Sequence, residues 1–186
     1  APMVAAAQQR AATLDASHSP LMPTRAFLAV CTMFSLRYES PYLLPWVAHS
    51  LAMGVEHLFL YDDDISPSWR STPPNVALLR TLQAHPNVTL FRMSDVTKEL
   101  GCCYSDQQAV QQQHCEQLGE SRAVWMGGWD IDEYPVASTP VADGDGGCST
   151  PLARFGQRGG ASPLQSMLRG LPSPAWGVVL PRFAFE

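Results

Sequence analysis

The stretch VWMGGWDIDEYP, residues 124–135, places three carboxylates directly after an apolar run. Residues 122–129 are rich in apolar and aromatic side chains, which predicts a buried strand that ends where Asp130 begins. Side chains two positions apart on an extended chain point the same way, so Asp130 and Asp132 can face one ligand while Ile131 turns into the core. This stretch therefore predicts a binding site at the end of a strand.

Strand patterns alternate with helix patterns before this stretch. An apolar run at residues 27–34 predicts a strand that is buried on both faces, and a shorter run at 57–61 predicts a second strand. Between them, Ser40 can cap a helix, Pro41 suits its first position and Gly54 suits the position just past its end. The spacing i, i+3, i+4 and i+7 predicts that one buried face of this helix consists of Leu44, Val47, Ala48 and Leu51.

The alternation continues along the chain and indicates an α/β fold with a parallel sheet. In such sheets ligands bind at the carboxyl ends of the strands. A second acidic cluster, Asp62 to Asp64, follows the strand at 57–61 and falls at the same edge. We expect Asp62 to reach a nucleoside base or ribose, whereas Asp63 and Asp64 are equally well explained as turn and capping acids. The remaining predicted elements are helices at 73–85, 105–118 (capped by Ser105) and 163–171, and strands at 87–93 and 176–183.

The composition bounds the classes of function. The chain has 186 residues, of which 46% are hydrophobic and 16% charged, as in a globular domain. The net charge of −5 and the lack of a basic run argue against nucleic-acid binding. No apolar stretch is long enough to span a membrane. The chain does not start with Met and ends on an apolar run, so we expect it to be part of a longer protein.

The domain organisation follows from local composition. Residues 1–24 are rich in Ala, Gln, Ser and Pro and are expected to form a disordered linker or stalk remnant. Residues 25–186 are expected to form one incomplete domain. Within it, a Gly-rich stretch at about 137–162 is expected to be a long surface loop.

The cysteines do not predict a metal centre. There are five, an odd number, and none forms the paired C-x-x-C spacing of a zinc site. Cys31 lies in an apolar run and is expected to be a small core residue, while Cys102 and Cys103 are expected to be free thiols in a loop. The sequon at 87–89 lies where a turn enters a strand, which explains Asn87 without a sugar.

Oxygen ligands at Asp130 and Asp132 suit Mn²⁺ or Mg²⁺, ions that protein carboxylates bind together with substrate phosphates. No histidine is adjacent, which disfavours Zn²⁺. Such an ion would bridge the carboxylates to a diphosphate and neutralise charge on a leaving phosphate. A D-x-D pattern alone is weak evidence, because a second copy at 143–145 sits in the Gly-rich stretch and is best explained as loop.

Several motifs in order resemble glycosyltransferase family 92 and the wider family 2-like group. AVCTMFSLRYESPYLLPWVAHSLAMGVEHLFLYDDDIS at 29–66 is similar to the opening of that family. The Gln-rich helix with a cysteine at 107–118, followed by WMGGWDIDEY at 125–134, is similar to its later motifs. The resemblance covers about residues 26–135. The chain departs from the family pattern where a KNE-like turn is usual, at Pro45 where an acid is usual, and in the length of its Gly-rich insertion.

The resemblance implies a GT-A (Rossmann-like) nucleotide-sugar-binding sheet with flanking helices. It implies an inverting, metal-dependent transfer of a sugar, expected to be galactose, from a UDP-sugar to a glycan or glycoprotein acceptor. It implies Mn²⁺ (or Mg²⁺) at Asp130 and Asp132, with Asp132 the direct ligand. The expected location is the Golgi lumen, with a membrane anchor upstream of Ala1. The resemblance also implies that the sugar donor is bound by Asp62 and Asp130, and by Arg37 or Glu39 in place of the usual turn. It implies that Glu133 supports the metal or the acceptor side. The catalytic base is expected beyond Glu186.

Three alternatives stay open on the sequence. One is a non-catalytic GT-A-like domain kept for binding or scaffolding, which the altered turn favours. Another is a D-x-D phosphatase, although that signature follows the first strand of its domain and requires Thr or Val where this chain has Tyr134. The third is a sugar-binding module that requires neither nucleotide nor metal.

Overall fold

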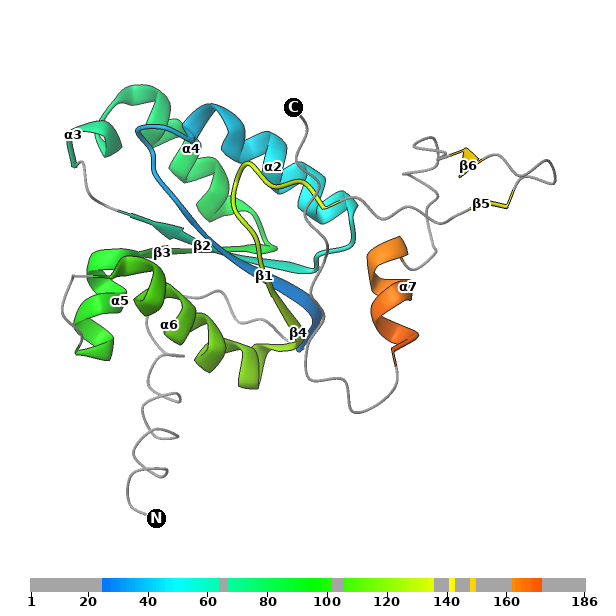
Figure 1. Ribbon diagram of the computed structural model, residues 1–186. Coiled ribbons are helices and arrows are strands. Elements are labelled where there is room, and N and C mark those ends of the chain that lie inside the picture. The colour runs from blue at the N-terminus through cyan, green and yellow to red at the C-terminus, as the bar shows by residue number, and fades with distance from the viewer. Residues whose placement is uncertain are drawn as a thin grey trace, which may run out of the picture.

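The protein is built on a four-stranded parallel sheet, as the alternation of strands and helices predicts. The computed structural model describes residues 25–63, 67–101, 106–135, 141–142, 148–149 and 162–171. The predicted linker at 1–24 and the predicted strand at 176–183 lie outside these residues. The sheet has the order β3-β2-β1-β4, and Figure 1 shows it in the middle of the molecule. The strands are β1 (Ala26–Phe34), β2 (His57–Asp62), β3 (Val88–Arg92) and β4 (Ala123–Gly128).

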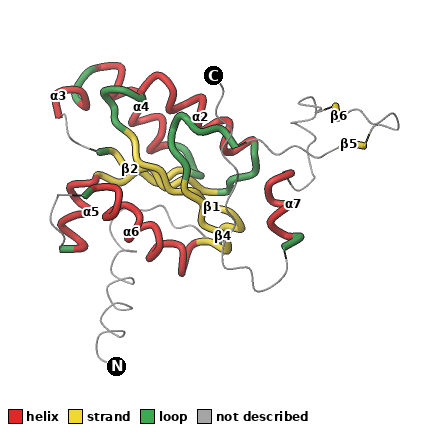
Figure 2. The backbone as a smooth tube through the Cα atoms, viewed as in Figure 1, coloured by secondary structure: helices red, strands yellow, loops and turns green. Residues whose placement is uncertain are grey.

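Helices cover both faces of this sheet, because the central strands are apolar on both faces. In β1, Leu28 and Val30 pack into one core cluster, whereas Ala29 and Cys31 pack into another. Figure 2 shows the helices on either side of the strands. The first cluster lies under α2 (Ser40–Ala52), α4 (Pro73–Ala84) and α7 (Pro163–Arg169), and the second under α5 (Met93–Leu100) and α6 (Gln107–Arg122).

The buried face of α2 differs from the predicted one. Leu44 is 42% exposed, whereas Trp46 is fully buried. The apolar spacing is correct for a helix, but the side chains Leu43, Trp46, Val47 and Ser50 face the core. Ser40 is the first helical residue and Glu39 occupies the cap position, so the predicted Ser40 cap is wrong. Gly54 lies just past the helix end with φ +94°, in the left-handed region that favours glycine.

Two helices were not predicted. α3 (Pro67–Arg70) is a single turn, and α5 follows β3 directly. α5 buries Met93, Val96 and Thr97 on one side and ends at Gly101, whose φ is +65°. Its short length and polar composition hide it in the sequence.

The helix before β4 begins one residue later than its predicted cap implies. Asp106 is the N-cap of α6 and its side chain accepts a hydrogen bond from Ala109 N–H at 3.1 Å. The predicted cap, Ser105, lies outside the described residues, as do Cys102 and Cys103.

The Gly-rich stretch contains a small hairpin. β5 (Val141–Ala142) and β6 (Cys148–Ser149) pair antiparallel, while the rest of residues 137–161 lies outside the described part of the chain. No helix among the described residues is both long and apolar enough to cross a membrane.

A disulfide joins the sheet to α6. Cys31 of β1 is bonded to Cys115 of α6, across 84 residues of sequence. The expectation that Cys31 is only a small core residue is therefore wrong, although the residue is buried. A disulfide between cysteines so far apart in the sequence cannot be predicted until the fold shows that they are neighbours.

Candidate functional site

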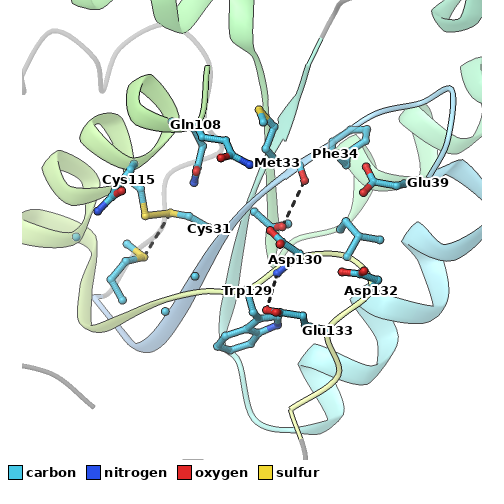
Figure 3. Close-up of a pocket in the computed structure, with 18 of the residues that line it drawn as sticks. Cys31, Met33, Phe34, Glu39, Gln108, Cys115, Trp129, Asp130, Asp132 and Glu133 are labelled. Atoms are coloured by element: carbon cyan, nitrogen blue, oxygen red, sulfur yellow. Dashed lines mark hydrogen bonds between the residues drawn. A yellow bond between two sulfur atoms is a disulfide. The ribbon is translucent and has the colours of Figure 1, made fainter. Parts of the chain in front are cut away.

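The predicted site lies in an open cavity of about 1400 Å³ along the carboxyl edge of the sheet and the side of β4. Most of its lining comes from three regions: the end of β1 with the turn after it, β4 with the segment 129–134 that follows it, and one face of α6. Arg25, Tyr42 and Asp63 complete the lining. Figure 3 shows Asp130, Asp132 and Glu39 on one side of this space and Gln108 on the other. The two aspartates of the D-x-D motif thus line the same cavity, as the sequence predicts.

The D-x-D motif forms a tight turn after β4. Glu133 N–H donates to the Asp130 carbonyl at 2.9 Å, and Asp130 N–H donates to Glu133 Oε2 at 3.1 Å. Ile131, between the two aspartates, is 1% exposed and belongs to the core, as predicted. The turn therefore directs Asp130 and Asp132 outward by anchoring Ile131 inward, and Glu133 stabilises the turn backbone.

Helix α2 holds this turn from behind. Trp46 is fully buried, and its indole N–H donates to the carbonyls of both Asp130 and Glu133 at 3.0 Å. One turn further along α2, His49 Nε2 lies 3.0 Å from the Pro135 carbonyl. These contacts span 84 to 87 positions in the sequence and fix the motif to a rigid helix.

Glycine is required just before the motif for a packing reason. A Cβ placed on Gly127 would lie 2.7 Å from Cζ3 of Trp129, so the indole ring packs directly on the glycine backbone. Trp129 and Trp125 both pack, partly buried, against the core, and Trp129 also lines the cavity.

Glu39 joins the two aspartates at the cavity. Its carboxylate accepts a hydrogen bond from Ser35 N–H at 2.5 Å, which closes the turn after β1. Burial raises the pKa of Glu39, the Ser35 hydrogen bond lowers it, and the negative charges of Asp63, Asp132 and Asp130 raise it. The net effect is a raised pKa, caused mainly by burial, and the smaller contributions of the three aspartates place Glu39 within their negative field.

Asp62 and Asp63 have different surroundings. Asp62 is 1% exposed and forms an ion pair with Arg70 of α3, and it is not among the lining residues of the cavity. Asp63 lines the cavity, and its backbone N–H donates to the Phe34 carbonyl at 2.9 Å. The sequence favours Asp62 as the donor contact, but the fold turns the next residue, Asp63, toward the site.

Arg37 lies away from the cavity. It is exposed, and its guanidinium lies 5.0 Å from the ring centroid of Tyr38. Of the two residues considered as substitutes for the usual family turn, Glu39 therefore lines the cavity and Arg37 does not.

His49 and His57 have structural surroundings. His57 is buried with Nε2 2.8 Å from Thr89 Oγ1. Asn87 Nδ2 donates to the Glu56 carbonyl at 2.7 Å, which fits a structural reading of the sequon.

The carboxylate oxygens at this site fit the ligand preference of a hard divalent cation that also binds substrate oxygens. Asp130 and Asp132 supply carboxylate oxygens from one turn, and Glu39 and Asp63 add negative charge around it. Within the described residues, no group of three or more His, Cys, Asp or Glu side chains is close enough to hold a metal by itself. Two carboxylates with the remaining ligands from substrate oxygens and water match Mg²⁺ or Mn²⁺ chemistry.

Comparison with known families identifies this arrangement. The family model described as glycosyltransferase family 92 matches residues 27–143, more than half of the chain. The chain belongs to glycosyltransferase family 92. No curated protein and no solved structure gives a significant match. The matched range of this family 92 domain contains the four-stranded sheet except Ala26, together with the predicted donor- and metal-binding residues. The parallel sheet with helices on both faces agrees with a Rossmann-like GT-A fold.

Sequence reasoning missed several lining residues of the family 92 domain. The sequence explains Asp63 equally well as a turn acid and does not single out Tyr42, although both line the cavity. It predicts the glutamines of α6 as a polar helix but not as a wall of the site. The available signal was the helical spacing of Gln108, Gln111 and Gln112 on the face that also carries Cys115.

Proposed function

We propose that this chain is the nucleotide-sugar-binding part of an inverting, metal-dependent transferase that moves galactose from UDP-galactose to a glycan or glycoprotein acceptor. The observation that supports it most is the D-x-D turn, which directs two carboxylates into a large cavity at the carboxyl edge of a family 92 sheet. Ligands of parallel α/β sheets bind at this edge.

In this proposal Asp130 and Asp132 hold Mn²⁺ or Mg²⁺, with Asp132 as the direct ligand. When bound, the ion would bind diphosphate oxygens and stabilise the negative charge of the UDP leaving group. Trp46 and Glu133 keep the two carboxylates in place through the turn backbone. Asp63 and Glu39 face the nucleoside side of the cavity, where their oxygens can accept hydrogen bonds from ribose hydroxyls.

The proposed location is the Golgi lumen, with a membrane anchor outside residues 1–186. The Cys31–Cys115 disulfide supports an oxidising compartment, because disulfides persist in secretory compartments and are rare in the cytosol. Mass spectrometry of the protein purified from its native membranes, with and without reduction, tests this point. Two free thiols at these positions in the native protein would contradict it.

A transfer assay tests the donor, the metal and the stereochemistry together. The parent protein, which includes the residues beyond Glu186 where the catalytic base is expected, is incubated with UDP-galactose, Mn²⁺ and a panel of neutral oligosaccharides. UDP release is measured together with the anomeric configuration of the product by NMR. The proposal predicts Mn²⁺-dependent release and a β-linked product from the α-linked donor. A retained configuration contradicts inversion, and release that is unchanged in EDTA contradicts the metal. Binding of UDP by the folded parent protein without any transfer favours the non-catalytic domain.

A further inference from the structure

One face of α6 forms a wall of the cavity that the proposed metal and nucleotide contacts do not use. The helix contributes Gln108, Gln111, Gln112, Cys115, Glu116 and Gly119 to the lining. These positions follow the spacing i, i+3, i+4, i+7, i+8 and i+11, which is a single helical face. At 1.5 Å per residue the wall extends roughly 16 Å along the helix axis.

The chemistry of this wall is that of neutral amides. Gln112 donates to Glu116 Oε1 at 3.2 Å, whereas the Gln108 and Gln111 side chains have no hydrogen-bond partner among the described residues. Figure 3 shows Gln108 across the cavity from Asp130 and Glu39. A side-chain amide offers both donors and an acceptor, which match the paired hydroxyls of a sugar.

The rest of the lining excludes an anionic ligand at this wall. Among the described lining residues, Arg25 is the one with a positive charge, and it lies near the start of β4, where its Nε donates to the Ala123 carbonyl. The other charged lining residues are carboxylates. Tyr42 and Tyr134, which are 60% and 42% exposed, add aromatic surface at the cavity. Amides, carboxylates and tyrosine rings together suit a neutral polyhydroxylated ligand.

The disulfide fixes the orientation of this wall. Cys115 lies in the middle of the amide face, and its bond to Cys31 fastens that face to β1. A rotation of α6 by one residue would turn the glutamines away from the cavity, and the covalent bond prevents it. A fixed wall reduces the entropy lost when a ligand is bound.

We propose that the amide face of α6, centred on Gln108 and Gln111, is a subsite for a neutral hexose unit, held in orientation by the Cys31–Cys115 disulfide. The inference rests on the proposed function, since it assigns the sugar-binding part of the same cavity. The hexose can belong to the donor or to the acceptor, and both present the same hydroxyl chemistry.

The test uses a double variant, Gln108→Met with Gln111→Met, and a control variant, Gln117→Met, which is exposed on the same helix outside the cavity lining. Methionine keeps the side-chain length and the helix propensity but removes the amide. The titrants are UDP, UDP-galactose and a neutral galactose-containing oligosaccharide, each with Mn²⁺. The expected result is unchanged UDP affinity and about a tenfold loss for UDP-galactose if the donor hexose binds here, or for the oligosaccharide if the acceptor does.

Other outcomes separate this inference from the proposed function. Unchanged affinity of the double variant for both sugar-containing titrants overturns the subsite and leaves the nucleotide site standing. The subsite is also overturned if wild type binds UDP-galactose no more tightly than UDP and does not bind the oligosaccharide. Oligosaccharide binding that the double variant loses, in a chain that does not bind UDP, supports the subsite and contradicts the proposed function.

Discussion

Single residues determine how the acidic motif is presented to the cavity. Asp130 and Asp132 point outward because Ile131 is buried between them and because Trp46 binds the carbonyls on both sides of the turn. These supporting contacts matter because two carboxylates bind an ion well only when their relative positions are fixed. The motif is thus positioned by a core helix, although the aspartates themselves lie at the surface.

Replacing Trp46 by Phe is expected to weaken the site without changing any carboxylate. The change removes the indole N–H donor that the Asp130 and Glu133 carbonyls share, at a cost of about 1–3 kcal/mol, and loosens the turn. Calorimetric titration of UDP with Mn²⁺ should show roughly tenfold weaker binding. The control is Trp125→Phe, which alters a partly buried indole of the same core cluster. Equal UDP affinity of the Trp46 variant and wild type would contradict the role given to Trp46.

Asp62 and Asp63 are expected to fail in different ways when each is changed to Asn. Asp62→Asn removes the charge that pairs with the partly exposed Arg70, so the free energy of unfolding should fall by about 1–3 kcal/mol. Asp63→Asn should leave stability nearly unchanged and reduce UDP affinity, because Asp63 lines the cavity. Chemical denaturation and UDP titration of both variants separate the two roles. Lower UDP affinity in a stable Asp62 variant would show that Asp62, rather than Asp63, contacts the sugar donor.

At the scale of elements, β1 and α6 define the long wall of the cavity. β1 is the central strand that pairs with both β2 and β4, and α6 packs against β1 and β4. The sequence predicts both elements, because β1 is a continuous apolar run and α6 is a long polar segment with a cap. It does not predict the buried phase of α2, since Trp46 replaces Leu44 in the core, nor the disulfide, which depends on tertiary proximity.

Loss of the disulfide is expected to lower the free energy of unfolding strongly and the affinity for UDP only slightly. The bond closes a loop of 84 residues, so the Cys115→Ser variant should lose about 2–5 kcal/mol of unfolding free energy. UDP affinity should fall little in the folded variant, because the D-x-D turn is held by α2 instead. Urea denaturation with UDP titration measures both effects, and wild type treated with dithiothreitol provides the matched control. An unchanged urea midpoint would show that the two cysteines are not bonded in solution.

At the scale of the whole molecule, a parallel sheet brings together carboxylates that lie far apart in the sequence. Glu39 follows β1, Asp63 follows β2, and Asp130 and Asp132 follow β4. The alternating pattern predicts this meeting at one edge, because parallel strands share their carboxyl ends. The pattern does not predict which of two adjacent acids faces the cavity, because a change of one residue in the strand end reverses the direction of the side chain.

Buried histidines make the stability of the whole fold dependent on pH. Burial lowers the pKa of His57 to about 4, with further lowering by Arg122 and His85, and burial lowers the pKa of His114 to about 4. In the unfolded chain each histidine binds a proton below about pH 6.5, whereas the folded chain binds it near pH 4. The unfolded state therefore holds more protons between these values, and stability falls as the pH drops from 6.5 toward 4.

Denaturation midpoints at pH 7.5 and pH 5.0 test this linkage. The free energy of unfolding should fall at pH 5.0 by about 2 kcal/mol for each buried histidine. His57→Gln, which can keep a hydrogen bond to Thr89, should show a smaller fall than wild type. A His57 variant as sensitive to pH as wild type would contradict the assignment.

The most direct test of the central claim is calorimetric titration of UDP into the chain with Mn²⁺ and with EDTA, for wild type, Asp132→Asn and Asp95→Asn. Asp95 is an exposed acid on α5 near Lys98, so its variant controls for the loss of one negative charge. We predict Mn²⁺-dependent binding by wild type and the Asp95 variant, and its loss in the Asp132 variant. A folded wild-type chain that binds no UDP with Mn²⁺, or an Asp132 variant that binds as wild type does, would contradict a donor-metal site at the D-x-D turn.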